Sequence, residues 1–174
     1  KVGFDQIHHS FSSTEHGQRL AGSARYDRYR PGNVTVAEWE RILSVDVNNL
    51  KHLQLTYGLT RQFIRYSTNP PESSKGKTLE KIELTVEEQE NLLLTAIIHD
   101  WAEAVVGDIS YELKTLKEED RELEELKKMT SGMFGEDNQV LLNRINFVTD
   151  TIIKDRNTKL GKMFNAIEGI GYLR

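Results

Sequence analysis

A cluster of ionisable residues interrupts the most apolar stretch of this sequence. His99 and Asp100 stand next to each other directly after residues 92–98. Glu103 follows one helical turn after His99, and Asp108 lies further on. Burying so many ionisable groups without a metal ion or charged partners costs several kcal/mol. Because perturbed polar groups in apolar surroundings gather at functional sites, we interpret this stretch as a site rather than as part of a core.

Divalent metal chemistry suits these residue types best. Neighbouring side chains on a helix point about 100° apart, but His99 and Asp100 can still reach one ion that sits beside a buried helix. Glu103 shares the helix face of His99. An acid held next to a metal ion without binding it suits a general acid or base. These residue types therefore favour a site for one divalent ion, and mixed nitrogen and oxygen ligands without sulfur fit Mn, Co, Fe, Zn or Mg.

Composition excludes several other classes of chemistry and partner. The 174 residues include no cysteine, which excludes disulfides, zinc–thiolate sites and thiol nucleophiles. The net charge of -4 creates no strong attraction for nucleic acid, although a local cationic pocket could still bind a mononucleotide. The longest apolar stretch, residues 92–98, is far too short to cross a bilayer. We expect a cytoplasmic protein whose partners include neither a nucleic acid nor a membrane.

Helices must position these residues, because apolar residues recur at helical spacing and signals for strands are nearly absent. Thr85 and Glu88 form a capping-box pattern that starts a buried central helix, and Gly107 ends that helix. The expected helices cover residues 15–29, 36–43, 45–66, 86–106, 116–129, 138–154 and 160–174, with a loop at residues 67–77. The sequence predicts an all-α fold in a single structural domain, with residues 1–34 as a helical extension.

A family resemblance adds to this interpretation. Residues 99–109 read H-D-x-x-E-x-x-x-G-D-I at the end of an apolar helix. This pattern resembles the HD-domain metal-dependent phosphohydrolases, especially the branch with bacterial 5'-deoxynucleotidases. The resemblance covers roughly residues 38–174 and is strong only at residues 97–114. It implies that residues 35–174 form an HD-type helical bundle, with the metal site between central helices.

The resemblance also implies roles for individual residues. In that family an upstream histidine, the His–Asp pair and a distant Asp hold one divalent ion. By similarity, His99 and Asp100 are metal ligands and Glu103 is the acid or base. Asp108 is a carboxylate that supports catalysis or positions the substrate, and Lys114 is a partner for phosphate.

Two histidines are candidates for the upstream ligand. His52 lies in the helix before the loop, where the family's first ligand belongs, but it follows Lys51 where the family has a glutamate. His16 follows Glu15 and so matches the local motif better, although it is much further from His99. We favour His52 and keep His16 as the alternative.

The substrate contacts and the last ligand depart from the family pattern. Trp39 matches a tryptophan that contacts substrate in the family, but Glu38 stands where an arginine normally precedes it. Arg41, or an arginine within residues 25–30, is the candidate replacement.

Asn165 occupies the position of the distant Asp, and Glu168 shares its helix face. An amide oxygen can bind a hard cation without adding charge, so both Asn165 and Glu168 stay candidates.

The resemblance implies an enzyme that releases phosphate from nucleoside or deoxynucleoside 5'-monophosphates. Its partners would then be small-molecule substrates. The resemblance is also compatible with a homodimer. The alternative is a catalytically weakened nucleotide-binding or interaction module of the same fold, which the Asn165 position motivates. A third interpretation, a purely structural helical protein, predicts that replacing His99 or Asp100 affects no ligand.

Overall fold

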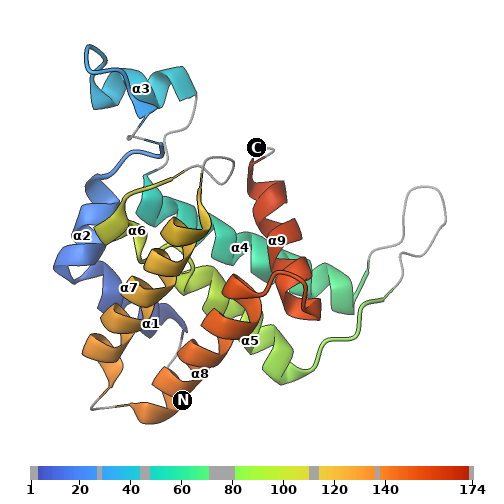
Figure 1. Ribbon diagram of the computed structural model, residues 1–174. Helices are drawn as coiled ribbons and strands as arrows, with labels where there is room; N and C mark the ends of the chain where they lie inside the picture. Colours follow the sequence, from blue (N-terminus) through green and yellow to red (C-terminus); the bar gives the residue numbers. More distant parts are fainter. Residues whose placement is uncertain are drawn as a thin grey trace, which may run out of the picture.

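The predicted all-α fold is confirmed. The computed structural model describes residues 4–26, 29–43, 48–70, 81–109, 114–135 and 138–172. Within these ranges the chain forms helices and no strand (Figure 1). An isolated antiparallel bridge joins Ala24 to Asn48. No helix in the described ranges combines the length and apolar character needed to cross a membrane.

The helices are joined by connections of unequal length, the longest between α2 and α3 and between α4 and α5. Their bounds are α1 Phe4–Ser12, α2 Glu15–Gly22, α3 Val36–Leu43, α4 Asn49–Thr68, α5 Val86–Ile98, α6 Glu103–Val106, α7 Leu116–Phe134, α8 Gln139–Val148, the π-helix η3 Thr149–Lys154, and α9 Lys159–Tyr172.

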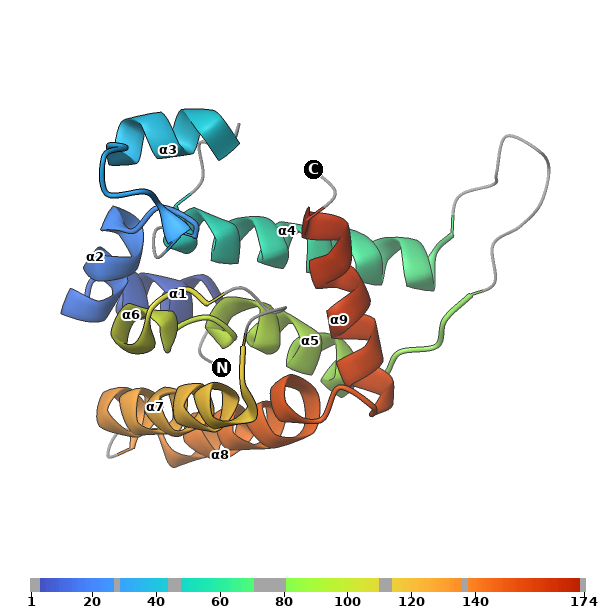
Figure 2. The ribbon, with the colours of Figure 1, turned by 45° about the horizontal axis from the view of Figure 1, so that its top comes forward.

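Helix α5 is the centre of the fold. Its capping box has both predicted hydrogen bonds, one from the backbone of Glu88 to the Thr85 hydroxyl and one from the backbone of Thr85 to the Glu88 carboxylate. Helices α1, α4, α8 and α9 all pack against it (Figure 2). The α5 side chains at 92, 94, 96, 97 and 98 are buried, and burying each larger one contributes roughly 1.5–3 kcal/mol. Strong packing on every side therefore fixes the end of α5 in place.

Helix α5 ends at Ile98, and the predicted continuous helix to Val106 is wrong. After Ile98 the backbone tightens, because the amides of Trp101 and Glu103 bond to carbonyls three residues back. Trp101 is fully buried and stacks on Phe11 of α1, with ring centroids 4.1 Å apart. As a consequence, His99 and Asp100 lie at the end of a helix rather than along its side.

Gly107 ends the short helix α6, as predicted, with a φ of 85° that favours glycine. Several other predicted bounds are wrong. Helix α2 ends at Gly22 instead of near Tyr29, and α7 continues through Gly132 to Phe134. Helix α4 continues through Thr68 into the predicted loop, and residues 71–77 of that loop lie outside the described residues.

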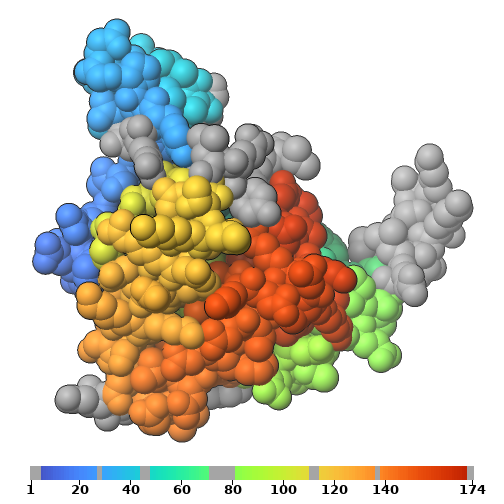
Figure 3. All heavy atoms as spheres, in the orientation of Figure 1, coloured from blue at the N-terminus to red at the C-terminus, as the bar shows by residue number. Residues whose placement is uncertain are grey.

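The N-terminal helix α1 was not predicted. Ile7 and Phe11, one helical turn apart, are both buried in the main core. Helix α3 has the predicted bounds but buries no residue, and it projects from the body of the molecule (Figure 3).

Candidate metal centre

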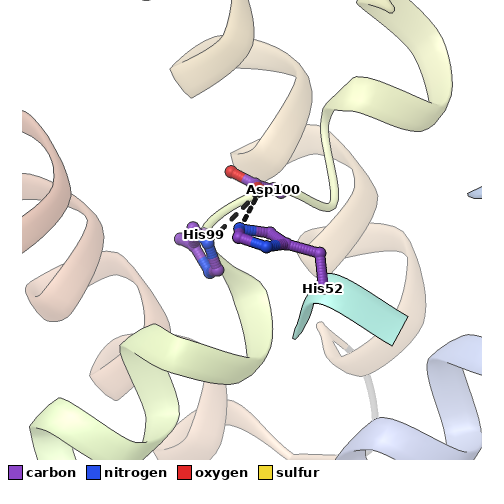
Figure 4. A group of neighbouring side chains, drawn as sticks. All are labelled: His52, His99 and Asp100. Atoms are coloured by element: carbon purple, nitrogen blue, oxygen red, sulfur yellow. Dashed lines mark ion pairs between the residues drawn. The ribbon is translucent and has the colours of Figure 1, made fainter. Parts of the chain in front are cut away.

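Two helices bring three potential metal ligands together. Asn48 caps α4 by accepting a hydrogen bond from the backbone of Lys51, which fixes the helix turn that carries His52. His99 and Asp100 lie directly at the end of α5, and their side chains point toward His52 (Figure 4). One donor atom from each residue lies within 4.8 Å of the other two.

The distances suit a shared cation. Nε2 of His99 lies 3.3 Å from Oδ2 of Asp100, and Nε2 of His52 lies 3.5 Å from the same oxygen. Two ligands bound at about 2.1 Å in a tetrahedral arrangement lie about 3.4 Å apart. The three donors can therefore hold one ion with little rearrangement.

His99 is oriented as a metal-binding histidine is. Its Nδ1 lies 3.2 Å from the carbonyl oxygen of Ala96. Because a carbonyl only accepts, Nδ1 must carry the proton, and in the neutral ring Nε2 presents its lone pair to the cluster. That Nε2 atom is buried and has no hydrogen-bond partner among the described residues. A buried nitrogen of this kind fits a metal ion.

The electrostatics of the cluster favour a cation. Burial lowers the pKa of His52 to about 3, so this imidazole is neutral and able to coordinate. Burial also lowers the pKa of His99, but the negative charges of Asp100 and Glu168 outweigh burial and raise it. The attraction that favours a proton on Nε2 of His99 also favours a metal ion at the same place.

Of the two candidates for the last ligand, Glu168 is nearer the cluster. Its Oε1 lies 3.6 Å from Nε2 of His99. Asn165 is exposed, and its Oδ1 accepts a hydrogen bond of 3.4 Å from Arg156. Both residues line a cavity of about 50 Å³ beside His99 and Asp100, which has room for an ion or a water molecule.

Glu103 and Asp108 lie beside the cluster, next to a buried arginine. Nη1 of Arg25 is 3.4 Å from Glu103, 3.5 Å from Asp108 and 3.6 Å from Asp100. Burial, together with the charges of Asp100 and Asp108, raises the pKa of Glu103 well above its usual range. Glu103 therefore favours its protonated form, which is the form that a general acid needs.

The predicted substrate-binding residues lie at different distances from the cluster. Lys114 lines the small cavity and forms an ion pair of 2.7 Å with Glu122. Trp39 on α3 donates from Nε1 to the backbone oxygen of Arg25, at 3.0 Å. Arg41 is exposed on α3 and lines a separate hollow with Glu38, so the structure does not bring it to the cluster.

The structure places His52 beside His99, whereas His16 lies on α2 outside the three-residue cluster. The segment predicted as an extension, residues 1–34, contributes Arg25 to the site and Phe11 to the core.

Two site residues were not singled out from the sequence. Arg25 was one of several arginines considered, and nothing in its neighbours marks it as buried. Glu122 belongs to a charge-rich helix that looked solvated, yet its Oε1 is buried without a hydrogen-bond partner in the described part of the chain. The sequence shows only that acids are frequent along α7, and their frequency does not identify the inward-facing one.

We compared the chain with protein-family models, with curated proteins and with solved structures, and none of them matched.

Proposed function

We propose that this chain is a metal-dependent phosphohydrolase of the HD type that releases phosphate from nucleoside or deoxynucleoside 5'-monophosphates. One observation carries the proposal. Two imidazoles that are far apart in the sequence, His52 and His99, meet within 3.5 Å of one carboxylate oxygen, on Asp100, at the buried end of the central helix.

A divalent ion in such a site supplies a coordinated water of lowered pKa and neutralises charge on a phosphate group. His52, His99 and Asp100 would hold the ion, and Glu168 is near enough to complete the set. With neutral imidazoles and carboxylates as donors, the set fits Mn, Co, Fe, Zn or Mg.

The neighbouring residues suit the remaining steps of a phosphate-ester hydrolysis. Burial raises the pKa of Glu103, which favours its protonated form, and Glu103 would donate that proton to the leaving oxygen of the nucleoside. Lys114 lines the cavity beside His99 and Asp100, where its ammonium group would bind a phosphate oxygen. Asp108 accepts a hydrogen bond of 2.7 Å from the backbone of Tyr26 and so holds the Arg25 segment against the site.

The test combines metal analysis with a hydrolysis panel. Purified protein would be analysed for bound metal, and phosphate release would be measured over a panel of nucleoside and deoxynucleoside 5'-monophosphates with added Mn, Co or Mg. We expect the wild-type protein to bind a divalent metal ion and to release phosphate only when that metal is present. The variant His99→Ala should lose both metal binding and phosphate release. His9→Ala is the matched control, because His9 is an exposed histidine on α1 and its loss should change neither readout. Unchanged phosphate release by His99→Ala would contradict the proposal.

A second candidate function is supported by Arg25. Its guanidinium group already lies within 3.6 Å of three carboxylates, so it balances part of their negative charge without a metal ion. This arrangement fits a catalytically weakened nucleotide-binding module. A protein that binds a nucleotide without metal and without turnover would favour the module over the enzyme.

A further inference from the structure

Glu103 also lines a larger cavity, of about 480 Å³. Helices α2, α4, α6 and α7 or their ends contribute its walls, and Glu103 and Asp108 line it. Its size is within the usual range for small-molecule sites, about 300–1,000 Å³. None of the cluster residues His52, His99 and Asp100 lines this cavity.

A buried acceptor in its wall has no partner. Asn49 is only 1% exposed, and its side-chain Oδ1 makes no hydrogen bond within the described residues. An unsatisfied buried amide oxygen costs roughly 1–3 kcal/mol, so such an atom in a cavity wall indicates a ligand that donates to it. The backbone amide of Asn49 bonds to the carbonyl of Ser23, at 3.1 Å, which holds this residue in position.

The charge of the cavity selects against phosphate. Glu103, Asp108 and Glu118 line it, and Arg121 is the one basic residue in the part of the lining that the structure describes. Ala24, Val106 and Ile109 add apolar wall. A pocket with apolar walls and several acceptors fits a neutral group that carries hydroxyl or amine donors.

The side chain of Arg25 contacts both the wall of the large cavity and the metal cluster. Nη1 of Arg25 lies 3.5 Å from Asp108, in the wall of the large cavity, and 3.6 Å from Asp100, in the wall of the small one. The guanidinium group of Arg25 therefore lies between a residue that lines the large cavity and a residue that lines the small one.

We infer that the cavity beside Asn49 and Val106 binds the nucleoside part of the substrate, with the Asn49 amide oxygen accepting from a sugar hydroxyl or a base amine. This inference rests on the proposed function for the identity of the ligand, while the binding itself needs neither metal nor turnover.

The test measures binding of phosphate-free deoxynucleosides, thymidine and deoxyadenosine, by calorimetry or ligand-observed NMR on the full chain. We expect at least one to bind with a Kd on the order of 1 mM. Val106→Phe fills the cavity and should weaken that binding at least about tenfold. Val105→Phe is the matched control, because Val105 is exposed and does not line the cavity. Asn49→Leu should weaken binding similarly without lowering the melting temperature, since it removes an acceptor that has no partner.

Absence of binding by either nucleoside, or wild-type affinity in Val106→Phe, overturns the inference. Inorganic phosphate is the second probe, and its binding should be the same in Val106→Phe as in the wild-type protein. Nucleoside binding that depends on Val106, in a protein that releases no phosphate from any nucleotide, would support this inference and contradict only the proposed hydrolysis.

Discussion

The carbonyl oxygen of Ala96 lies 3.2 Å from Nδ1 of His99, and this contact decides which nitrogen of the ring faces the cluster. Ala96 is one turn before His99 and is completely buried. The central helix therefore does more than carry the histidine, because its own backbone sets the tautomer that metal binding requires.

Replacing Glu103 should affect turnover and leave metal binding intact. Glu103→Gln removes the proton donor but keeps the size of the side chain, so we expect kcat for nucleotide hydrolysis to fall roughly 10²–10⁴-fold. Metal content, measured on the same sample, should equal that of the wild-type protein. A wild-type rate in Glu103→Gln would show that the assigned role is wrong.

The same variant should change how stability depends on pH. Because the pKa of Glu103 is raised in the folded protein, the folded state holds this proton more tightly than the unfolded state does. Its contribution to stability is complete below the unfolded pKa, about 4.3, and is lost as pH rises toward the folded value. Glutamine mimics the protonated acid, so in chelator-treated samples Glu103→Gln should be more stable than wild type at pH 7. Urea unfolding should show this difference shrinking toward pH 4, and a constant difference would argue against a raised pKa.

Glu168 and Asn165 should contribute unequally to metal affinity. Glu168 lies 3.6 Å from the His99 nitrogen, whereas Asn165 is exposed and bonded to Arg156. We expect Glu168→Gln to weaken metal binding about 10–100-fold and Asn165→Ala to leave it within about twofold. Competition with a chromogenic chelator measures both. The opposite ranking would mean that the amide is the ligand.

Removing Arg25 should destabilise the metal-free protein. Arg25→Met leaves three neighbouring carboxylates without their shared cation, and breaking such a buried arrangement costs about 3–5 kcal/mol. The loss should be smaller at pH 4, because burial raises the pKa values of Glu103 and Asp108 and so favours their neutral forms as the pH falls. Asp100 stays charged there, because His99 and His52 hold its pKa low. Lys127→Met is the control: its ion pair with Asp150 is solvent-exposed, and losing it should cost less than about 1 kcal/mol. Equal effects of the two variants in urea unfolding would contradict the importance of the buried charges.

The helices that carry strong local signals were predictable from the sequence. The Thr85–Glu88 capping box and the Gly107 stop are both present, and α3 has the predicted bounds. The break after Ile98 was not predictable, because residues 97–106 keep a helical apolar pattern. It coincides with the stacking of Trp101 on Phe11, which is a contact between distant segments.

Part of the candidate metal site was predictable from the sequence, because ionisable residues within an apolar stretch are unusual. His99 and Asp100 stand out within an apolar stretch, and the structure puts His52 next to them, as we had favoured. Arg25 could not be selected, since its burial depends on how the chain after α2 folds over α6. The distances that rank Glu168 ahead of Asn165 depend on how α9 crosses α4 and α5, which no local pattern specifies.

The most direct test of the central claim is anomalous diffraction from crystals grown with Mn or Co. We predict one anomalous peak within about 2.0–2.3 Å of an imidazole nitrogen of His52, an imidazole nitrogen of His99 and a carboxylate oxygen of Asp100. A loaded crystal with no peak between these residues, or with the ion held by other side chains, would contradict the account.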